Sequence, residues 1–151
     1  MSVLAKWGPH VARVVLGLLF VVFGLNYFLS FLPTPPPPPE QALPFLGGLM
    51  ASGYVFPVIK AIEVAAGVAL LTNRFVPLAL TLLAPIIVNI ALFHFVLAPS
   101  YGLPVTILVL ELYLAWSYRA AFAPMLRARV APATGDGEPV ATGRPVAAAV
   151  R

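Results

Sequence analysis

The stretch VFPVIKAIEVAAGVALL, residues 55–71, is apolar almost throughout, yet it carries two charged residues three positions apart, Lys60 and Glu63. A continuous apolar run of this length lacks the in–out alternation of a barrel strand, which favours a buried helix. Hydrophobic residues make up 61% of the 151 residues and charged residues only 9%, whereas soluble domains carry about 25% charged residues. Lipid is therefore the expected solvent for most of this chain.

Four stretches of the chain are apolar and long enough to serve as membrane spans, which need about 20 residues. They cover residues 11–32, 54–71, 75–97 and 103–122. Helices are expected because lipid offers no hydrogen-bond partner to exposed backbone groups. We expect the first span to be retained rather than cleaved as a signal peptide, since no small-x-small cleavage site follows Phe31. The sequence therefore predicts an all-α integral membrane protein, a four-transmembrane-helix bundle formed by residues 1–126.

The connections between these spans differ in length and composition. Residues 33–53 include five consecutive prolines, residues 35–39, which are expected to form a stiff polyproline II segment, followed by a short helical segment at the membrane interface. The other two connections, TNR and APSYG, are short and make neighbouring helices antiparallel. Residues 127–151 are rich in Ala, Pro and Gly and predict a disordered tail.

Basic residues lie beside only some of these connections. The start of the chain, the turn TNR and the tail carry them, whereas residues 33–53 and APSYG contain no Lys or Arg. The basic residues that flank the spans are Lys6, Arg13, Arg74, Arg119, Arg127 and Arg129. Because short cytoplasmic loops are enriched in Lys and Arg, both termini are predicted to be cytoplasmic and the Pro-rich loop to be external.

Six polar residues from the four spans fall in the outer half of the predicted bundle or near its midplane. They are Asn26, Lys60, Glu63, Asn89, His94 and Glu111. At a rise of about 1.5 Å per residue, they lie roughly 6–12 Å from the outer ends of their helices. Charged side chains are costly in lipid, so these residues are expected to face the bundle interior and to pair.

Two carboxyl groups and one ammonium group at similar depth cannot all be paired. We expect Lys60 to neutralise Glu63 on the same helix face, although Lys60 is also close enough to the outer interface to extend toward water instead. Glu111 is expected to meet this pair across the bundle and to keep its proton, because an unpaired ionised carboxylate is costly in lipid.

Three roles are open for this polar set. The residues can form interhelical hydrogen bonds that fix the register of the bundle. They can instead line a polar pocket that binds a quinone headgroup or relays protons, with Glu63, Glu111 and His94 as the titrating members. Transport of a small molecule is the third role. Pro85 favours a pocket, because it is expected to kink the third span toward Asn89 on the same helical stripe.

Several longer motifs resemble one known family. They are ARVVLGLLFVVFGLNYF in the first span, Glu63 followed by Gly67 in the second, LAPIIVNIALFH in the third and ELYLAW in the fourth. Across residues 12–126 the chain resembles the DoxX family of small bacterial membrane proteins. The resemblance implies a multi-pass, four-helix protein of the bacterial cytoplasmic (inner) membrane. Some members are linked to membrane oxidoreductase complexes, including thiosulfate oxidation with quinone and complexes with oxidative-stress enzymes.

The resemblance therefore implies a non-catalytic membrane subunit or anchor of a redox enzyme complex, with quinone as its expected ligand. The expected partners are the lipid bilayer, a redox enzyme subunit and a second copy of the chain. Two alternatives stay open. One is a small-solute carrier, which would be oligomeric because four short helices enclose little space, and the other is a purely structural membrane protein.

Composition disfavours several other functions. The chain has no cysteine, which excludes disulfides, thiolate metal sites and iron–sulfur clusters. His10 and His94 lie near opposite ends of the predicted bundle, so a haem held by two histidines is not expected, and no metal-ligand cluster has suitable spacing. The sequence contains no catalytic constellation, phosphate-binding loop or nucleic-acid-binding motif. No enzymatic activity is therefore assigned to this chain alone.

Overall fold

The computed structural model describes residues 3–130, and within this range all regular secondary structure is helical, as predicted. The elements are α1 (Val3–Leu29), η1 (Glu40–Ala42), α2 (Leu43–Ala51), α3 (Val55–Leu71), α4 (Val76–Leu92), η2 (Phe93–Leu97), α5 (Gly102–Ser117) and α6 (Arg119–Phe122). η1 is a 3-10 helix and η2 is a π-helix. The predicted disordered tail lies outside the described residues except for residues 127–130.

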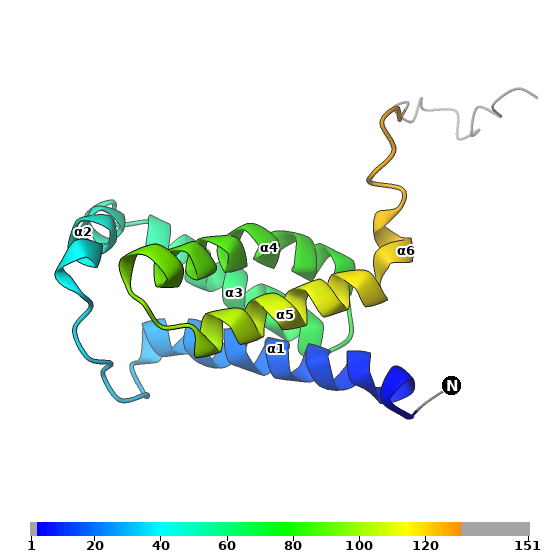
Figure 1. Cartoon of the computed structure of the whole chain (residues 1–151), viewed down its shortest axis with the longest axis horizontal. Helices are drawn as coiled ribbons and strands as arrows, with labels where there is room; N and C mark the ends of the chain where they lie inside the picture. Colours follow the sequence, from blue (N-terminus) through cyan, green and yellow to red (C-terminus); the bar gives the residue numbers. More distant parts are fainter. Residues whose placement is uncertain (1–2, 131–151) are drawn as a thin grey trace, which may run out of the picture.

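The four longest helices form an antiparallel bundle (Figure 1). α1 packs against α3 and α5, and α4 packs against the same two helices. α2 lies across one end of this bundle, whereas α6 and the first residues of α1 lie at the opposite end. We call these the α2 end and the α6 end. Short turns after α3 and η2 produce the antiparallel order, because helices joined by few residues pack as neighbours.

The centre of the bundle is filled by aliphatic side chains. Leu16, Leu70 and Ile87, from three different helices, are fully buried. α1 and α3 approach closely where Gly17 faces Gly67, since a methyl group added at Gly67 would lie 2.9 Å from the carbonyl oxygen of Gly17. Small residues at such a crossing let two helix backbones come together, which increases the packing contact between them.

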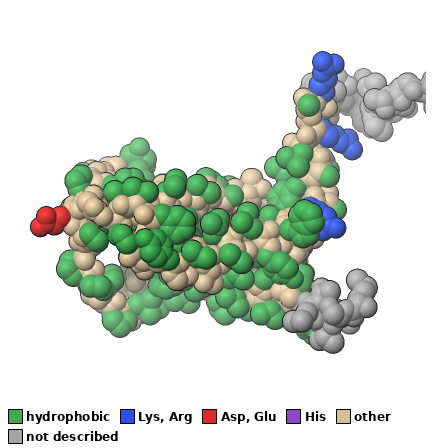
Figure 2. All heavy atoms as spheres, in the orientation of Figure 1, with side chains coloured by type: hydrophobic (Ala, Val, Ile, Leu, Met, Phe, Trp, Pro, Cys, Tyr) green, Lys and Arg blue, Asp and Glu red, His purple; other side chains and the backbone are tan. Residues whose placement is uncertain are grey.

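The sides of the bundle are apolar, whereas exposed charged side chains gather at its two ends (Figure 2). Large apolar residues such as Leu18 of α1, Leu82 of α4, and Val109 and Leu112 of α5 are exposed. An acidic side chain is visible at the α2 end and basic side chains at the α6 end. Soluble monomers rarely expose contiguous apolar patches larger than a few hundred Å², so this surface is suited to lipid.

By length and composition, two helices of the described chain are able to cross a membrane, Trp7–Leu29 and Val76–Leu97. The segment Glu40–Ala51 and α3 together are also long and apolar enough, but the two helices are bent by 87° relative to each other. They count as a third span only if they are taken as one broken helix. α5 is apolar but has only 16 residues. The chain thus has two or three candidate spans, and the four-span topology with cytoplasmic termini stays a prediction.

Two features near the α6 end differ from the sequence prediction. Arg13 was expected to flank the first span, but α1 begins at Val3, and Arg13 lies inside the bundle with 8% of its surface exposed. The predicted fourth span is divided at Tyr118, whose φ of −98° and ψ of 14° interrupt the helix. Arg119 stabilises this break, because it donates a hydrogen bond to the carbonyl oxygen of Trp116 at 3.0 Å and lies over the indole ring.

Candidate functional site

A cavity of about 420 Å³ lies at the α2 end of the bundle, between α2, α3, α4 and η2. Its walls are mainly aliphatic and aromatic, with four polar side chains among them. The lining residues are Phe45, Leu46, Leu49, Phe56, Ile59, Lys60, Glu63, Pro85, Ile86, Asn89, Ile90, Phe93 and His94. Small-molecule sites are typically apolar cavities of about 300–1,000 Å³ with a few placed polar groups. This cavity has that size and that composition.

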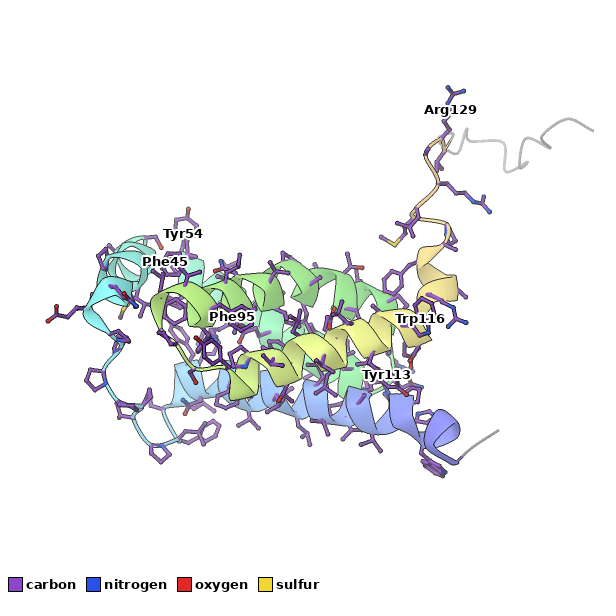
Figure 3. All side chains as sticks on the ribbon, in the orientation of Figure 1. Phe45, Tyr54, Phe95, Tyr113, Trp116 and Arg129 are labelled. Carbon is purple, nitrogen blue, oxygen red and sulfur yellow. The ribbon has the colours of Figure 1, made fainter. Side chains whose placement is uncertain are left out.

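α2 forms one wall of the cavity because the chain turns sharply after it. Gly53 takes a φ of 72° at this turn, a conformation that favours glycine. Gln41, directly before α2, donates a hydrogen bond from Nε2 to the carbonyl oxygen of Leu97 at 2.9 Å. Phe45 lies at the α2 end of the bundle (Figure 3). The centroid of its ring is 5.9 Å from that of Phe93. Both contacts hold the α2 segment against η2.

Lys60 and Glu63 form an ion pair on the cavity wall, as the sequence predicts. Lys60 Nζ donates hydrogen bonds to both carboxylate oxygens of Glu63, at 2.8 and 3.1 Å. Glu63 is 2% exposed, and the Lys60 side chain is 21% exposed. The alternative, in which Lys60 extends away from Glu63 toward water, is not what the structure shows. The pair places opposite charges beside an otherwise apolar space.

His94 contributes a hydrogen-bond acceptor to the same cavity. Its Nδ1 lies 2.8 Å from the carbonyl oxygen of Ile90. A carbonyl oxygen only accepts hydrogen bonds, so Nδ1 carries a hydrogen, and the neutral imidazole tautomer with this hydrogen has its lone pair on Nε2. His94 lies in η2, where the amide of Ala98 bonds to the carbonyl oxygen of Phe93 in the i to i+5 pattern of a π-helix. Short π-helical turns often occur at functional sites.

Pro85 and Asn89 belong to the α4 wall of the cavity, where Asn89 is the polar side chain. Both residues line it, and both are also exposed at the surface of the bundle. The cavity is therefore continuous with the apolar side of the molecule. α4 runs as one helix from Val76 to Leu92 through Pro85. The kink predicted at Pro85 is not needed for this residue to reach the cavity, and it stays a prediction.

Asn26 does not join the cavity, although the sequence groups it with the other polar residues. Its Oδ1 accepts a hydrogen bond from the backbone amide of Leu32 at 2.7 Å. Ser30 between them has a φ of 49°, the left-handed conformation that commonly ends a helix. Asn26 thus stabilises the exit from α1 toward the Pro-rich segment, which is a structural role.

Glu111 is buried in the bundle, with 5% of its surface exposed, but it does not line the cavity. Its neighbours Leu110 and Tyr113 line a separate apolar cavity between α1 and α5, together with Gly8 and Val11. Among the described residues, Glu111 Oε2 has no hydrogen-bond partner.

No hydrogen bond or ion pair joins Glu111 to the Lys60–Glu63 pair among the described residues. Lys60 Nζ bonds to Glu63, and Glu111 Oε2 has no partner. The predicted meeting of Glu111 with the ion pair, and the prediction that Glu111 keeps its proton, therefore stay predictions.

Arg13 is a buried charge, although the sequence predicts that it flanks the first span. Its Nη1 donates a hydrogen bond to the carbonyl oxygen of Leu70 in the last turn of α3, and its Nε has no partner among the described residues. A cation is favourable near the carboxyl end of a helix. Its position in the sequence is consistent with burial, because Arg13 lies within the apolar run of the first span rather than before it.

Within residues 3–130, no group of three or more His, Cys, Asp or Glu side chains is arranged to hold a metal ion. Comparison of the chain with protein-family models, with curated proteins and with solved structures finds no match.

Proposed function

We propose that this chain is a DoxX-like protein of the bacterial inner membrane that crosses the bilayer four times, and that its cavity binds the ring of a membrane quinone for a partner redox enzyme. One observation carries the proposal. The Lys60–Glu63 pair and His94 line an otherwise apolar cavity that reaches the lipid-suited side of the bundle. The family resemblance supports the redox partner.

The chemistry of the cavity matches a molecule with an apolar ring and oxygen substituents. Phe45, Phe56 and Phe93 provide aromatic surface, on which a flat ring packs favourably. The ammonium group of Lys60 can donate a hydrogen bond to a ring oxygen, and the imidazole of His94 can accept one from a ring hydroxyl group. Asn89 lies where the cavity reaches the surface, so a ligand dissolved in lipid has a lateral route in.

The test is to purify the full chain in a mild detergent and to measure the quinone and the proteins that accompany it. We expect roughly one quinone per cavity and a co-purifying redox enzyme subunit. The variant Lys60→Met with Glu63→Gln should lose the quinone, while Glu40→Gln, an exposed residue at the α2 end, should keep it. Recovery of the chain without quinone or partner, together with solute flux in liposomes, would support the carrier instead.

A further inference from the structure

Two polar groups of opposite hydrogen-bonding character line the cavity. The Lys60 ammonium group has three hydrogens and serves both oxygens of Glu63, so it remains a donor on the α3 wall. On the η2 wall, the hydrogen bond to Ile90 fixes Nδ1 of His94 as the protonated nitrogen and leaves Nε2 as an acceptor. The ring of Phe93 packs edge to face on this imidazole, with centroids 5.1 Å apart, and restricts its orientation.

We infer from this pairing that the cavity selects the reduced form of its ligand, a quinol with ring hydroxyl groups, over the oxidised quinone. This inference rests on the proposed function and adds to it which redox state binds. The hydroxyl groups of a quinol can both accept a hydrogen bond, as Lys60 requires, and donate one, as His94 requires. A quinone carbonyl accepts from Lys60 but leaves His94 Nε2 without a partner.

The unpaired acceptor is what disfavours the quinone. His94 is only partly exposed, and among the described residues its ring makes one hydrogen bond, from Nδ1 to Ile90, so Nε2 has no partner in the protein. Leaving a desolvated acceptor unsatisfied is more costly than replacing both partners by apolar groups. His94 therefore determines specificity through a hydrogen bond that only the hydroxyl form completes. The inference concerns binding alone, and no electron transfer within this chain is required.

The experiment compares three ligands in the full chain held in lipid nanodiscs without oxygen. The ligands are decyl-ubiquinol, decyl-ubiquinone and the dimethyl ether of the quinol, which keeps the ring but has no hydroxyl donor. Affinity is measured by competition with a tritiated quinol. We expect the quinol to bind roughly tenfold more tightly than either of the others. Equal binding of all three would overturn this inference while leaving the proposed function in place.

Two substitutions at His94 separate hydrogen bonding from packing. His94→Phe should bind the quinol as weakly as the dimethyl ether, and His94→Gln, which keeps an acceptor, should retain part of the preference. His10→Phe, a matched change at the exposed histidine near the α6 end, should leave all affinities unchanged. A quinol preference that persists in His94→Phe would contradict the role of His94. Failure of the wild-type chain to bind any of the three would overturn the proposed function and this inference together.

A spectroscopic readout follows the same hydrogen bond directly. In a chain labelled with ¹⁵N-histidine, the Nε2 resonance of His94 should shift on addition of quinol and stay in place on addition of the dimethyl ether. A purely structural role of His94 predicts the same spectrum in both cases.

Discussion

Lys60 and Glu63 form an ion pair one helical turn apart on α3, with Nζ of Lys60 2.8 Å from Oε2 of Glu63. Glu63 is almost completely buried, whereas Lys60 is partly exposed to the cavity. Either charge would destabilise the protein in this position without the other. The ammonium group is the only cation that contacts the Glu63 carboxylate among the described residues, so the carboxylate depends on it.

Removing Lys60 alone should therefore be worse than removing both charges. Loss of one partner of a buried pair typically costs about 3–5 kcal/mol, because the other charge is left uncompensated. We expect Lys60→Met to approach the lower end of that range and Lys60→Met with Glu63→Gln to recover most of the stability. Thermal unfolding in detergent measures the difference. Equal losses in the two variants would show that Lys60 does not compensate Glu63.

The contact between α1 and α3 predicts a second effect on stability. A side chain at Gly67 would meet the backbone oxygen of Gly17 at 2.9 Å, and a backbone atom cannot move aside as a flexible side chain can. Gly67→Ala should destabilise the protein by about 1–3 kcal/mol through overpacking. Gly47→Ala is the matched control, since nothing lies within 4 Å of a methyl group there. A neutral Gly67→Ala would mean that the two helices pack less closely.

The third prediction concerns the contribution of α2 to ligand binding. Phe45 lines the cavity and packs near Phe93, so Phe45→Ala should weaken quinol binding by roughly two- to tenfold. Met50→Ala tests the same helix away from the cavity, because Met50 is 70% exposed and does not line it. The measurement is the affinity of each variant for quinol in nanodiscs. If both variants bind like the wild type, α2 is not part of the binding site.

The fourth prediction concerns the position of the chain in the membrane. The turn after α3 and the start of α6 lie at the same end of the bundle (Figure 1), so they should face the same compartment. Reporter fusions after Thr72 and at the C-terminus should read cytoplasmic, and a fusion near Glu40 should read external. An external C-terminal signal would contradict the four-span topology.

Local features of this protein were predictable from sequence. The apolar runs place α3 and α4 within one residue of their observed starts, Val55 and Val76. The Lys60–Glu63 pair follows from spacing on a single helix, which does not depend on how the other helices pack. These predictions needed only helical geometry and the cost of charge in lipid.

Features that depend on packing between elements were not predictable in the same way. Depth along a helix does not show which side chains share a cavity, so Glu111 was grouped with Glu63 although only Glu63 lines the cavity. The hydrogen bond from the Leu32 amide to Asn26 depends on the left-handed conformation of Ser30. The contribution of Phe45 to the cavity requires the 87° bend between α2 and α3, which no periodicity in the sequence encodes.

The central claim is that the cavity at the α2 end holds the ring of a quinone. The most direct measurement is photolabelling of the full chain in nanodiscs with a tritiated azido-quinone, followed by mapping of the labelled peptides. The account predicts label on residues 43–63 and 85–94, reduced by excess quinol and by Lys60→Met with Glu63→Gln. Label confined to α1 and α5, or label that excess quinol does not displace, would contradict it.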